Sequence, residues 1–206
     1  MTDPAIRDVP ERWPALSTEE RFRGHIFSVR TDRVGMPGGE AADRDVVEHP
    51  GAVAVLALDE AERVLMIRQY RHPAGMSLWE LPAGLRDVDG EPLLATAERE
   101  LGEETGYRAG DWLTLADYFT TPGMSSERVR VFLARGVTEI PPAERTFTAR
   151  HEEASMQVAW VPLDDAVSGV IAGHVHSPTA VVGILAAYAA RAKGFATLRG
   201  AGAPEG

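Results

Sequence analysis

The sequence contains no cysteine, which excludes disulfides, zinc sites built on thiolates and cysteine nucleophiles. Chains without cysteine do not depend on an oxidising compartment, so we expect this one in the cytoplasm. It has no apolar run of the roughly 18 residues that a membrane-spanning helix needs. Residues 1–20 are acidic, contain three prolines and lack the apolar segment of a secretory signal. We therefore expect no membrane partner.

Lysine is nearly absent, because Lys193 is the only lysine among the 21 cationic residues, and basic runs are missing altogether. Aspartate and glutamate together number 31, which gives a net charge of -10. Proteins that bind nucleic acid by counterion release present a basic face, so this composition predicts no nucleic-acid partner. An acidic surface is also expected to repel small anions, and any anionic substrate would have to overcome that repulsion.

The composition that is present, 44% hydrophobic and 25% charged, is typical of a globular protein. We divide the chain into an N-terminal arm and β-strand pair at 1–50 and a main domain at 51–206. Within the first part, residues 1–20 are expected to form a loose or partner-dependent arm. Alternation of apolar and polar residues predicts strands at 25–34 and 43–49, with a glycine-rich turn between them.

The main domain begins with a continuous apolar run at 52–58, which predicts a buried central strand. The segment 93–105 is rich in Ala, Leu, Glu and Arg and is followed by Gly106, which predicts a helix with a glycine stop. Other strands are expected at 64–71, 112–120, 129–134 and 156–161, and other helices at 163–172 and 179–192. The glycine- and alanine-rich tail from Gly194 is expected to be frayed. This order of elements predicts an α+β fold or an α/β/α sandwich.

Three carboxylates, those of Glu100, Glu103 and Glu104, fall on the helix predicted at 93–105. Spacings of three and four residues place them on one helix face. A solvated acidic surface is the usual meaning of such a face. Here a proline-stiffened segment at 79–84 ends in a glycine and leads through a loop into the helix. Aligned carboxylates after such a loop are a candidate site for Mg²⁺ or Mn²⁺, which prefer oxygen ligands.

The segment from Gly84 through Glu91 to Tyr107 resembles the Nudix box. The family pattern is Gly, five residues, Glu, seven residues, then Arg-Glu-apolar-x-Glu-Glu-x-Gly-apolar. The run from Arg99 to Tyr107 matches the second half fully, and the one departure is that six residues separate Gly84 from Glu91. The resemblance covers about residues 20–190. It implies a Nudix α/β/α sandwich with a mixed sheet.

The resemblance also implies hydrolysis of a nucleoside diphosphate linked to another group, at a site that holds Mg²⁺ or Mn²⁺. A divalent cation neutralises charge on the pyrophosphate and activates it for attack by water. Arg99 and Glu91 would pair and brace the loop against the helix. The implied metal ligands are three carboxylates and one backbone carbonyl: Glu100, Glu103, Glu104 and Ala83. Among these, Glu104 is also a predicted catalytic residue, and its replacement by alanine is expected to reduce the rate by orders of magnitude while leaving the fold intact.

The flanks of the box resemble the ADP-ribose pyrophosphatase subgroup. Pro122 stands where that subgroup has a proline, and Glu127 lies in a similar loop after the box, where it would approach the metal or the substrate. Arg71, with Arg44 as second choice, would bind phosphate through the two parallel donors of its guanidinium. Each of these residues has a plain structural alternative, an ordinary turn for the proline and solvation for the arginines.

Two further roles are implied by the same subgroup. Phe27 or Trp13 would stack on adenine, although simple core packing also explains Phe27. The general base would be Glu152 or Glu153 on the loop before the strand at 156–161, and the sequence does not decide between them. His151 is a rival base by its pKa. This loop is expected to close on the substrate.

Taken together, these features predict Mg²⁺-dependent hydrolysis of ADP-ribose to AMP and ribose 5-phosphate. The resemblance to the subgroup also implies a homodimer, because its members commonly exchange N-terminal strands between two copies. The alternatives are a pyrophosphatase for nucleotide sugars or dinucleotides, and a non-catalytic domain that senses a nucleotide. The net charge of -10 is compatible with an anionic substrate, because grouped carboxylates can hold a cation that faces the pyrophosphate.

Overall fold

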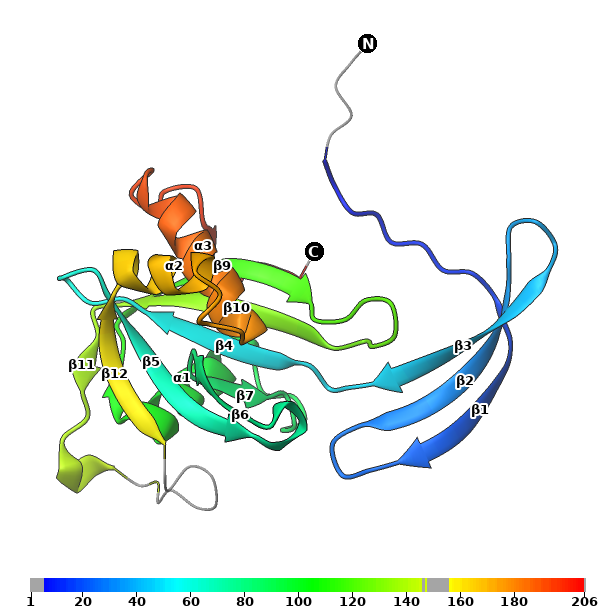
Figure 1. Cartoon of the computed structure of the whole chain (residues 1–206), viewed down its shortest axis with the longest axis horizontal. Helices are drawn as coiled ribbons and strands as arrows, with labels where there is room; N and C mark the ends of the chain where they lie inside the picture. The colour runs from blue at the N-terminus through cyan, green and yellow to red at the C-terminus, as the bar shows by residue number, and fades with distance from the viewer. Residues whose placement is uncertain (1–5, 146, 148–155, 206) are drawn as a thin grey trace, which may run out of the picture. The chain divides into compact units, whose positions relative to one another are not determined.

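The computed structural model describes residues 6–145, 147 and 156–205 (Figure 1). The chain divides into two compact units, and each is described by itself. The N-terminal unit comprises Met1–His49 together with Thr121–Ser126. The second unit comprises Pro50–Thr120 and Glu127–Gly206. A short stretch from the middle of the chain is therefore part of the N-terminal unit.

The N-terminal unit is a three-stranded antiparallel sheet in the order β1-β2-β3. Its strands are β1 Ala15–Arg23, β2 Ser28–Gly35 and β3 Ala41–Glu48. The prediction of a strand pair preceded by a loose arm at 1–20 was wrong at residues 15–20, which belong to β1. The β1 sequence lacks the apolar alternation that predicts a strand, and all of its side chains are exposed. The strand is held to β2 by backbone pairing and by side-chain contacts, such as the hydrogen bond that Thr18 Oγ1 donates to Asp32 Oδ1 at 2.8 Å.

The segment 121–126 joins the end of β3 through backbone hydrogen bonds. The Val47 amide donates to the Met124 carbonyl at 2.8 Å, and the Ser126 amide donates to the Val47 carbonyl at 3.0 Å. The His49 amide donates to Ser126 Oγ at 3.1 Å. The loop that contains Pro122 is thus built onto the N-terminal sheet.

The second unit contains a five-stranded mixed sheet in the order β13-β9-β10-β4-β7, in which β10 and β4 are parallel and the other pairs antiparallel. Its strands are β4 Ala52–Ala57, β7 Ala83–Leu85, β9 Asp111–Phe119, β10 Arg128–Arg135 and β13 Arg199–Gly200. A three-stranded antiparallel sheet, in the order β12-β5-β6, consists of β5 Arg63–Arg71, β6 Met76–Glu80 and β12 Gln157–Pro162. A small pair is formed by β8 Tyr107–Arg108 and β11 Thr138–Glu139.

Helices cover both faces of the mixed sheet (Figure 1). The α-helices are α1 Leu93–Thr105, α2 Leu163–Ile171 and α3 Pro178–Arg191, and short 3-10 turns occur at His72–Ala74 and Pro142–Glu144. Leu56 of β4 packs in one apolar cluster with Ile184 of α3, and the adjacent Val55 packs in another with Leu101 of α1. Because successive strand residues face opposite sides, this pattern confirms the predicted α/β/α sandwich.

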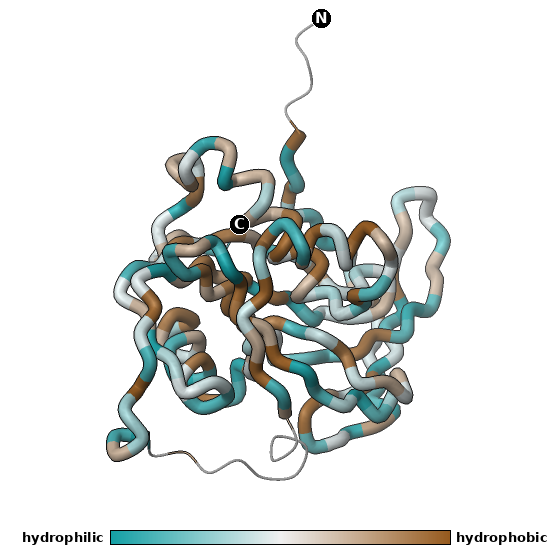
Figure 2. Tube along the Cα trace, turned by 60° about the vertical axis from the view of Figure 1, so that its left-hand side comes forward, coloured by the Kyte–Doolittle hydropathy of each residue, from teal (hydrophilic) through white to brown (hydrophobic). Residues whose placement is uncertain are grey.

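The buried residues of these two clusters lie mainly on strands and helices, and Figure 2 shows that hydrophobic and hydrophilic residues are interspersed along the chain. Helix α1 has the predicted bounds and ends at Gly106, whose φ of 74° is left-handed and whose amide donates to the Gly102 carbonyl at 2.9 Å. Glycine adopts this conformation without a steric penalty. No helix in the described part of the chain has the length and apolar character to cross a bilayer.

The prediction of a frayed tail after Gly194 was wrong. Phe195 is buried in the apolar cluster under α3. Gly200 pairs with Leu113 of β9, and its carbonyl accepts a hydrogen bond from Thr114 Oγ1 at 3.0 Å. The tail therefore extends the central sheet at its β9 edge.

Candidate metal and catalytic site

The three carboxylates of α1 lie on the helix face next to β7. The Ala83 amide donates to Glu104 Oε2 at 2.8 Å. At Gly84, an added Cβ would lie 2.1 Å from Glu100 Cδ, a distance that no side chain could occupy. The glycine that begins the box is thus required because the β7 backbone contacts the first of the three carboxylates directly.

Arg99 braces the box loop against α1, as the sequence predicted. Its Nε donates to Glu91 Oε1 at 3.3 Å and its Nη2 to Glu91 Oε2 at 3.1 Å. Thr96 Oγ1 donates to the same carboxylate at 2.8 Å. These hydrogen bonds, led by those from Arg99, lower the pKa of the Glu91 carboxyl. The loop turns just before Glu91, where the Glu91 amide donates to the Val88 carbonyl at 3.2 Å and Gly90 has a φ of 76°.

Arg99 also contacts two of the candidate metal ligands. Its Nη1 lies 2.7 Å from Glu100 Oε1 and 3.3 Å from Glu103 Oε2. Burial raises the pKa of the Glu100 carboxyl, and repulsion from Glu103 and Asp87 adds to that rise, while Arg99 opposes it. Within residues 6–145, 147 and 156–205, no three acidic or histidine side chains converge as the ligands of a metal would.

The donor set nonetheless fits a divalent cation. Three carboxylates on adjacent turns, beside the backbone of β7, supply the hard oxygen ligands that Mg²⁺ and Mn²⁺ prefer. The close approach of Gly84 to Glu100 places that carboxylate directly beside the strand, where an added Cβ would not fit. The residues present are therefore compatible with the metal that the family resemblance implies.

Arg71, the first candidate for phosphate binding, is held by a carboxylate that sequence reasoning missed. Its Nε donates to Glu80 Oε1 at 2.9 Å and its Nη2 to Glu80 Oε2 at 2.7 Å. Glu80 is only 4% exposed, whereas the arginine side chain is 45% exposed. A fork of two parallel hydrogen bonds fixes the guanidinium at the end of β5. A lone acidic residue in the apolar stretch 78–81 was the signal for this partner.

The candidates for adenine binding and the second arginine lie in the N-terminal unit. Phe27 is exposed, with its ring 6.0 Å from that of Phe22, and Trp13 is exposed as well. Arg44 Nη1 donates to the Asp43 carbonyl at 2.9 Å on β3. Core packing therefore does not explain Phe27 within this unit.

The remaining candidates fall in three different places. Pro122 is exposed in the segment that pairs with β3. Glu127 is in the second unit, where its carboxylate accepts a hydrogen bond from Thr120 Oγ1 at 2.6 Å and closes the base of the loop. Glu152 and Glu153, the candidate bases, and the rival His151 lie outside the described residues.

A cavity of about 510 Å³ lies beside the C-terminal half of α1. Glu103 and Glu104 line it, and so does Arg145, whose Nη2 donates to Glu139 Oε1 at 2.7 Å and whose Nε donates to the Ile140 carbonyl at 3.0 Å. Sequence reasoning missed Arg145, because no motif includes it. The cavity is thus lined by an arginine as well as by two of the candidate metal ligands.

Comparison with known proteins agrees with these features. Residues 48–178 match the model of the NUDIX domain. The chain is 47% identical over 184 residues to an ADP-ribose pyrophosphatase of Mycobacterium tuberculosis (strain ATCC 25618 / H37Rv), a match that covers 89% of this chain and 86% of that protein. It is 35% identical over 161 residues to an ADP-ribose pyrophosphatase of Bacillus subtilis (strain 168), with 78% and 84% covered.

A crystal structure of an ADP compounds hydrolase has the same fold. It superposes with a TM-score of 0.75 at 18% sequence identity and covers 91% of this chain and 99% of that chain. The predicted fold class is confirmed by this likeness. With the matched domain spanning residues 48–178 and the box residues arranged on α1 as described, the chain belongs to the Nudix family.

Proposed function

We propose that this protein hydrolyses the pyrophosphate bond of ADP-ribose to AMP and ribose 5-phosphate in a Mg²⁺-dependent reaction. The observation that carries the proposal is the box itself, in which Glu100 and Glu104 contact β7 and Arg99 pairs with Glu91. The choice of substrate is supported by the two similar proteins, which are both named ADP-ribose pyrophosphatase.

In the proposed mechanism, the chain positions the pyrophosphate and the attacking water. Glu100, Glu103, Glu104 and the carbonyl of Ala83 would hold the metal. When bound, a divalent cation neutralises the pyrophosphate oxygens and polarises the phosphorus. Glu127 lies at the base of the loop that follows β9 and would approach the metal or the substrate.

Arg71 is the proposed phosphate ligand, and Glu80 is the residue that positions it. A guanidinium with two fixed donors loses less conformational freedom on binding than a mobile one. Arg44 is the proposed second arginine and Phe27 the proposed face for adenine. One of Glu152 and Glu153 would accept the proton of the attacking water, since a carboxylate within hydrogen-bond reach can act as general base.

We further propose that the N-terminal sheet mediates a homodimer. All of β1 is exposed and forms an edge of the sheet, and Leu16 and Phe22 on it are exposed apolar residues. An exposed edge strand that carries apolar side chains is a candidate surface for pairing with another chain. Light scattering after size-exclusion chromatography should give twice the mass of the 22.3 kDa chain, and a monomer at micromolar concentration would contradict this proposal.

A substrate panel tests the function. Purified protein with Mg²⁺ is incubated with ADP-ribose, nucleotide sugars and dinucleotides, and the nucleotide products are separated by chromatography. We expect the largest kcat/KM for ADP-ribose, equal amounts of AMP and ribose 5-phosphate, and no product with Glu104→Gln. A higher kcat/KM for a nucleotide sugar or a dinucleotide would replace the proposed substrate. ADP-ribose binding without product would instead indicate a sensor.

A further inference from the structure

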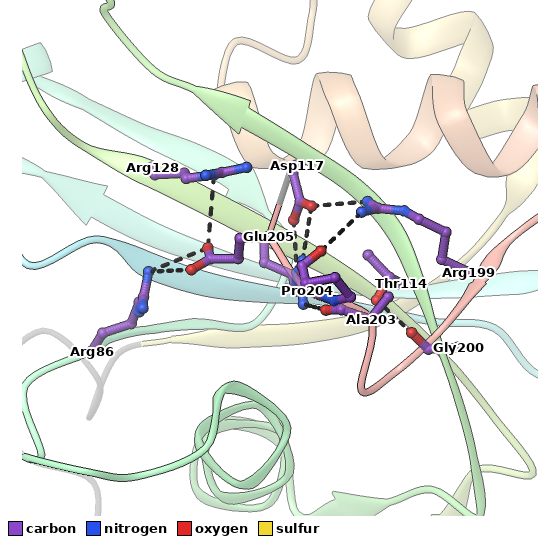
Figure 3. Close-up of polar contacts among 10 residues, drawn as sticks. Arg86, Thr114, Asp117, Arg128, Arg199, Gly200, Ala203, Pro204 and Glu205 are labelled. Carbon is purple, nitrogen blue, oxygen red and sulfur yellow. Dashed lines mark hydrogen bonds and ion pairs between the residues drawn. The ribbon is translucent and has the colours of Figure 1, made fainter. Parts of the chain in front are cut away.

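The C-terminal segment 199–205 is anchored to the second unit at three successive points. Its first point is β13, which pairs with β9. At the second, Arg130 Nη1 donates to the Ala203 carbonyl at 2.6 Å. At the third, Arg86 Nη1 donates to the Glu205 carboxylate at 3.3 Å, and Arg128 Nε lies 3.7 Å from the same group. Figure 3 shows the Glu205 carboxylate directed toward Arg86 and Arg128.

The middle anchor covers a buried ion cluster. Arg130 is 3% exposed and forms two hydrogen bonds with Asp117, at 2.7 and 2.9 Å. Arg199, just before the anchor, donates to the same carboxylate at 2.8 Å. Removing the tail would take a backbone acceptor from a buried guanidinium, which is costly. The segment is thus held in one place up to Pro204, and Glu205 has a defined position.

The third anchor connects the tail to the box loop. Arg86 directly follows β7, and residues 87–90 after it are all exposed. A cavity of about 390 Å³ separates the tail from the start of α1, and both Arg86 and Glu91 line it. The loop is therefore anchored at its start by Arg86, which contacts Glu205, and at its end by Glu91, which contacts Arg99. It is also one residue longer than the family pattern, which increases its need for anchors.

We propose that Glu205 is a positioning residue for the metal site. Its carboxylate fixes the Arg86 side chain, so the box loop delivers Glu91 to Arg99, and Arg99 in turn orients Glu100 and Glu103. The consequence for catalysis rests on the proposed metal-dependent hydrolysis. The proposed effect on the loop stands without it, because the contacts are all present in the protein alone.

The test compares Glu205→Gln, Glu205→Asp and a control, Glu62→Gln, with the wild type. Glu62 also pairs with an arginine, Arg191 at 3.1 Å, and lies in the same unit but away from the box sequence. Hydrogen exchange of metal-free protein is followed in peptides covering 86–91, and binding of Mn²⁺ alone is measured by electron paramagnetic resonance. Activity is measured last, as a function of Mg²⁺ concentration.

For Glu205→Gln we expect exchange in 86–91 and the Kd for Mn²⁺ to rise about two- to fivefold, the range of a partly exposed ion pair. The Mg²⁺ concentration for half-maximal activity should rise by the same factor as the Kd for Mn²⁺. At saturating Mg²⁺, kcat and the KM for ADP-ribose should stay unchanged. Glu205→Asp, which keeps the charge, should keep the exchange in 86–91 and the Kd for Mn²⁺ close to the wild-type values. The Glu62→Gln control should match the wild type.

Two results would overturn the proposal. The first is wild-type exchange in 86–91 with an unchanged Kd for Mn²⁺ in Glu205→Gln. The second is faster exchange throughout β4 and β10, which would mean that Glu205 only stabilises the unit. If the wild type fails to cleave ADP-ribose, the proposed function fails, but the exchange and Mn²⁺ measurements still decide the role of Glu205.

Discussion

The N-terminal sheet has no buried apolar residue among those described, whereas the second unit packs two apolar clusters against its central sheet. Among the described residues of the N-terminal unit, only Ser28 and Asp32 are buried, and neither is apolar. The second unit instead buries long runs of β4 and β10 between helices. Burial of apolar surface is the main source of stability. The sheet therefore depends on polar cross-strand contacts, and the second unit on its own core.

The sharpest contrast concerns ion pairs. In the second unit, Asp117→Asn removes the negative charge from the buried ion pair with Arg130. We expect this substitution to lower the free energy of unfolding by about 3 kcal/mol. In the sheet, Asp43 pairs with Arg33 on an exposed surface, so Asp43→Asn should cost less than about 1 kcal/mol. Urea denaturation of both variants measures the difference. Equal costs would remove the contrast.

Apolar truncation provides the second contrast. Leu101 is fully buried between α1 and the sheet, while Leu16 on β1 is 62% exposed. We expect Leu101→Ala to cost about 2–5 kcal/mol of unfolding free energy because it leaves a cavity. Leu16→Ala should cost less than about 0.5 kcal/mol in the monomeric state. A large cost at Leu16 that depends on protein concentration would point to the dimer interface instead.

The box glycine should affect activity more than stability. Gly84→Ala places a Cβ against Glu100, and displacement of a positioned group by about 1 Å typically reduces kcat about 100-fold. Gly110→Ala is the matched control, since an added Cβ there meets no atom within 4 Å. Steady-state kinetics with ADP-ribose and circular dichroism of both variants check the prediction. Full activity in Gly84→Ala would contradict the contact.

The smallest expected effect is a dependence on pH. Burial alone would raise the pKa of the Asp117 carboxyl, but hydrogen bonds from Arg130 and Arg199 outweigh it and lower that pKa. A lowered folded pKa means that the stabilisation is present above the unfolded value of about 3.9 and is lost as the pH falls through the folded value. The stability difference between wild type and Asp117→Asn should therefore be constant near neutral pH and shrink below about pH 4. Denaturation curves across that range measure it.

Much of the second unit could be predicted from the sequence because its signals are local. Helix α1 follows from composition and from Gly106, and the pairing of Arg99 with Glu91 follows from a motif within one loop and helix. The apolar run of β4 gives a buried strand for the same reason. Patterns within about 20 residues are visible without knowing the fold.

The missed features depend on distant or polar partners. Strand β1 has no apolar alternation, so only its pairing with β2 reveals it. The tail contacts Asp117 and Arg130, which are 82 and 73 residues away in the chain, and its glycine- and alanine-rich composition suggested disorder. Arg71 was predicted as a phosphate ligand, whereas its orientation depends on the buried Glu80, a partner that the pairing of β5 with β6 brings to it. Long-range contacts of this kind follow from topology rather than from local sequence.

The pairing of Val47 with residues 121–126 changes what can be separated by cutting the chain. The backbone passes between the two units three times, at 49–50, 120–121 and 126–127. Cleavage between His49 and Pro50 would leave the released piece hydrogen-bonded to a loop that stays covalently part of the larger fragment. Deletion of residues 1–49 would likewise leave that loop without its β3 partner. The N-terminal segment is thus one half of a shared structure, and it cannot be transferred to another protein without the loop that completes it.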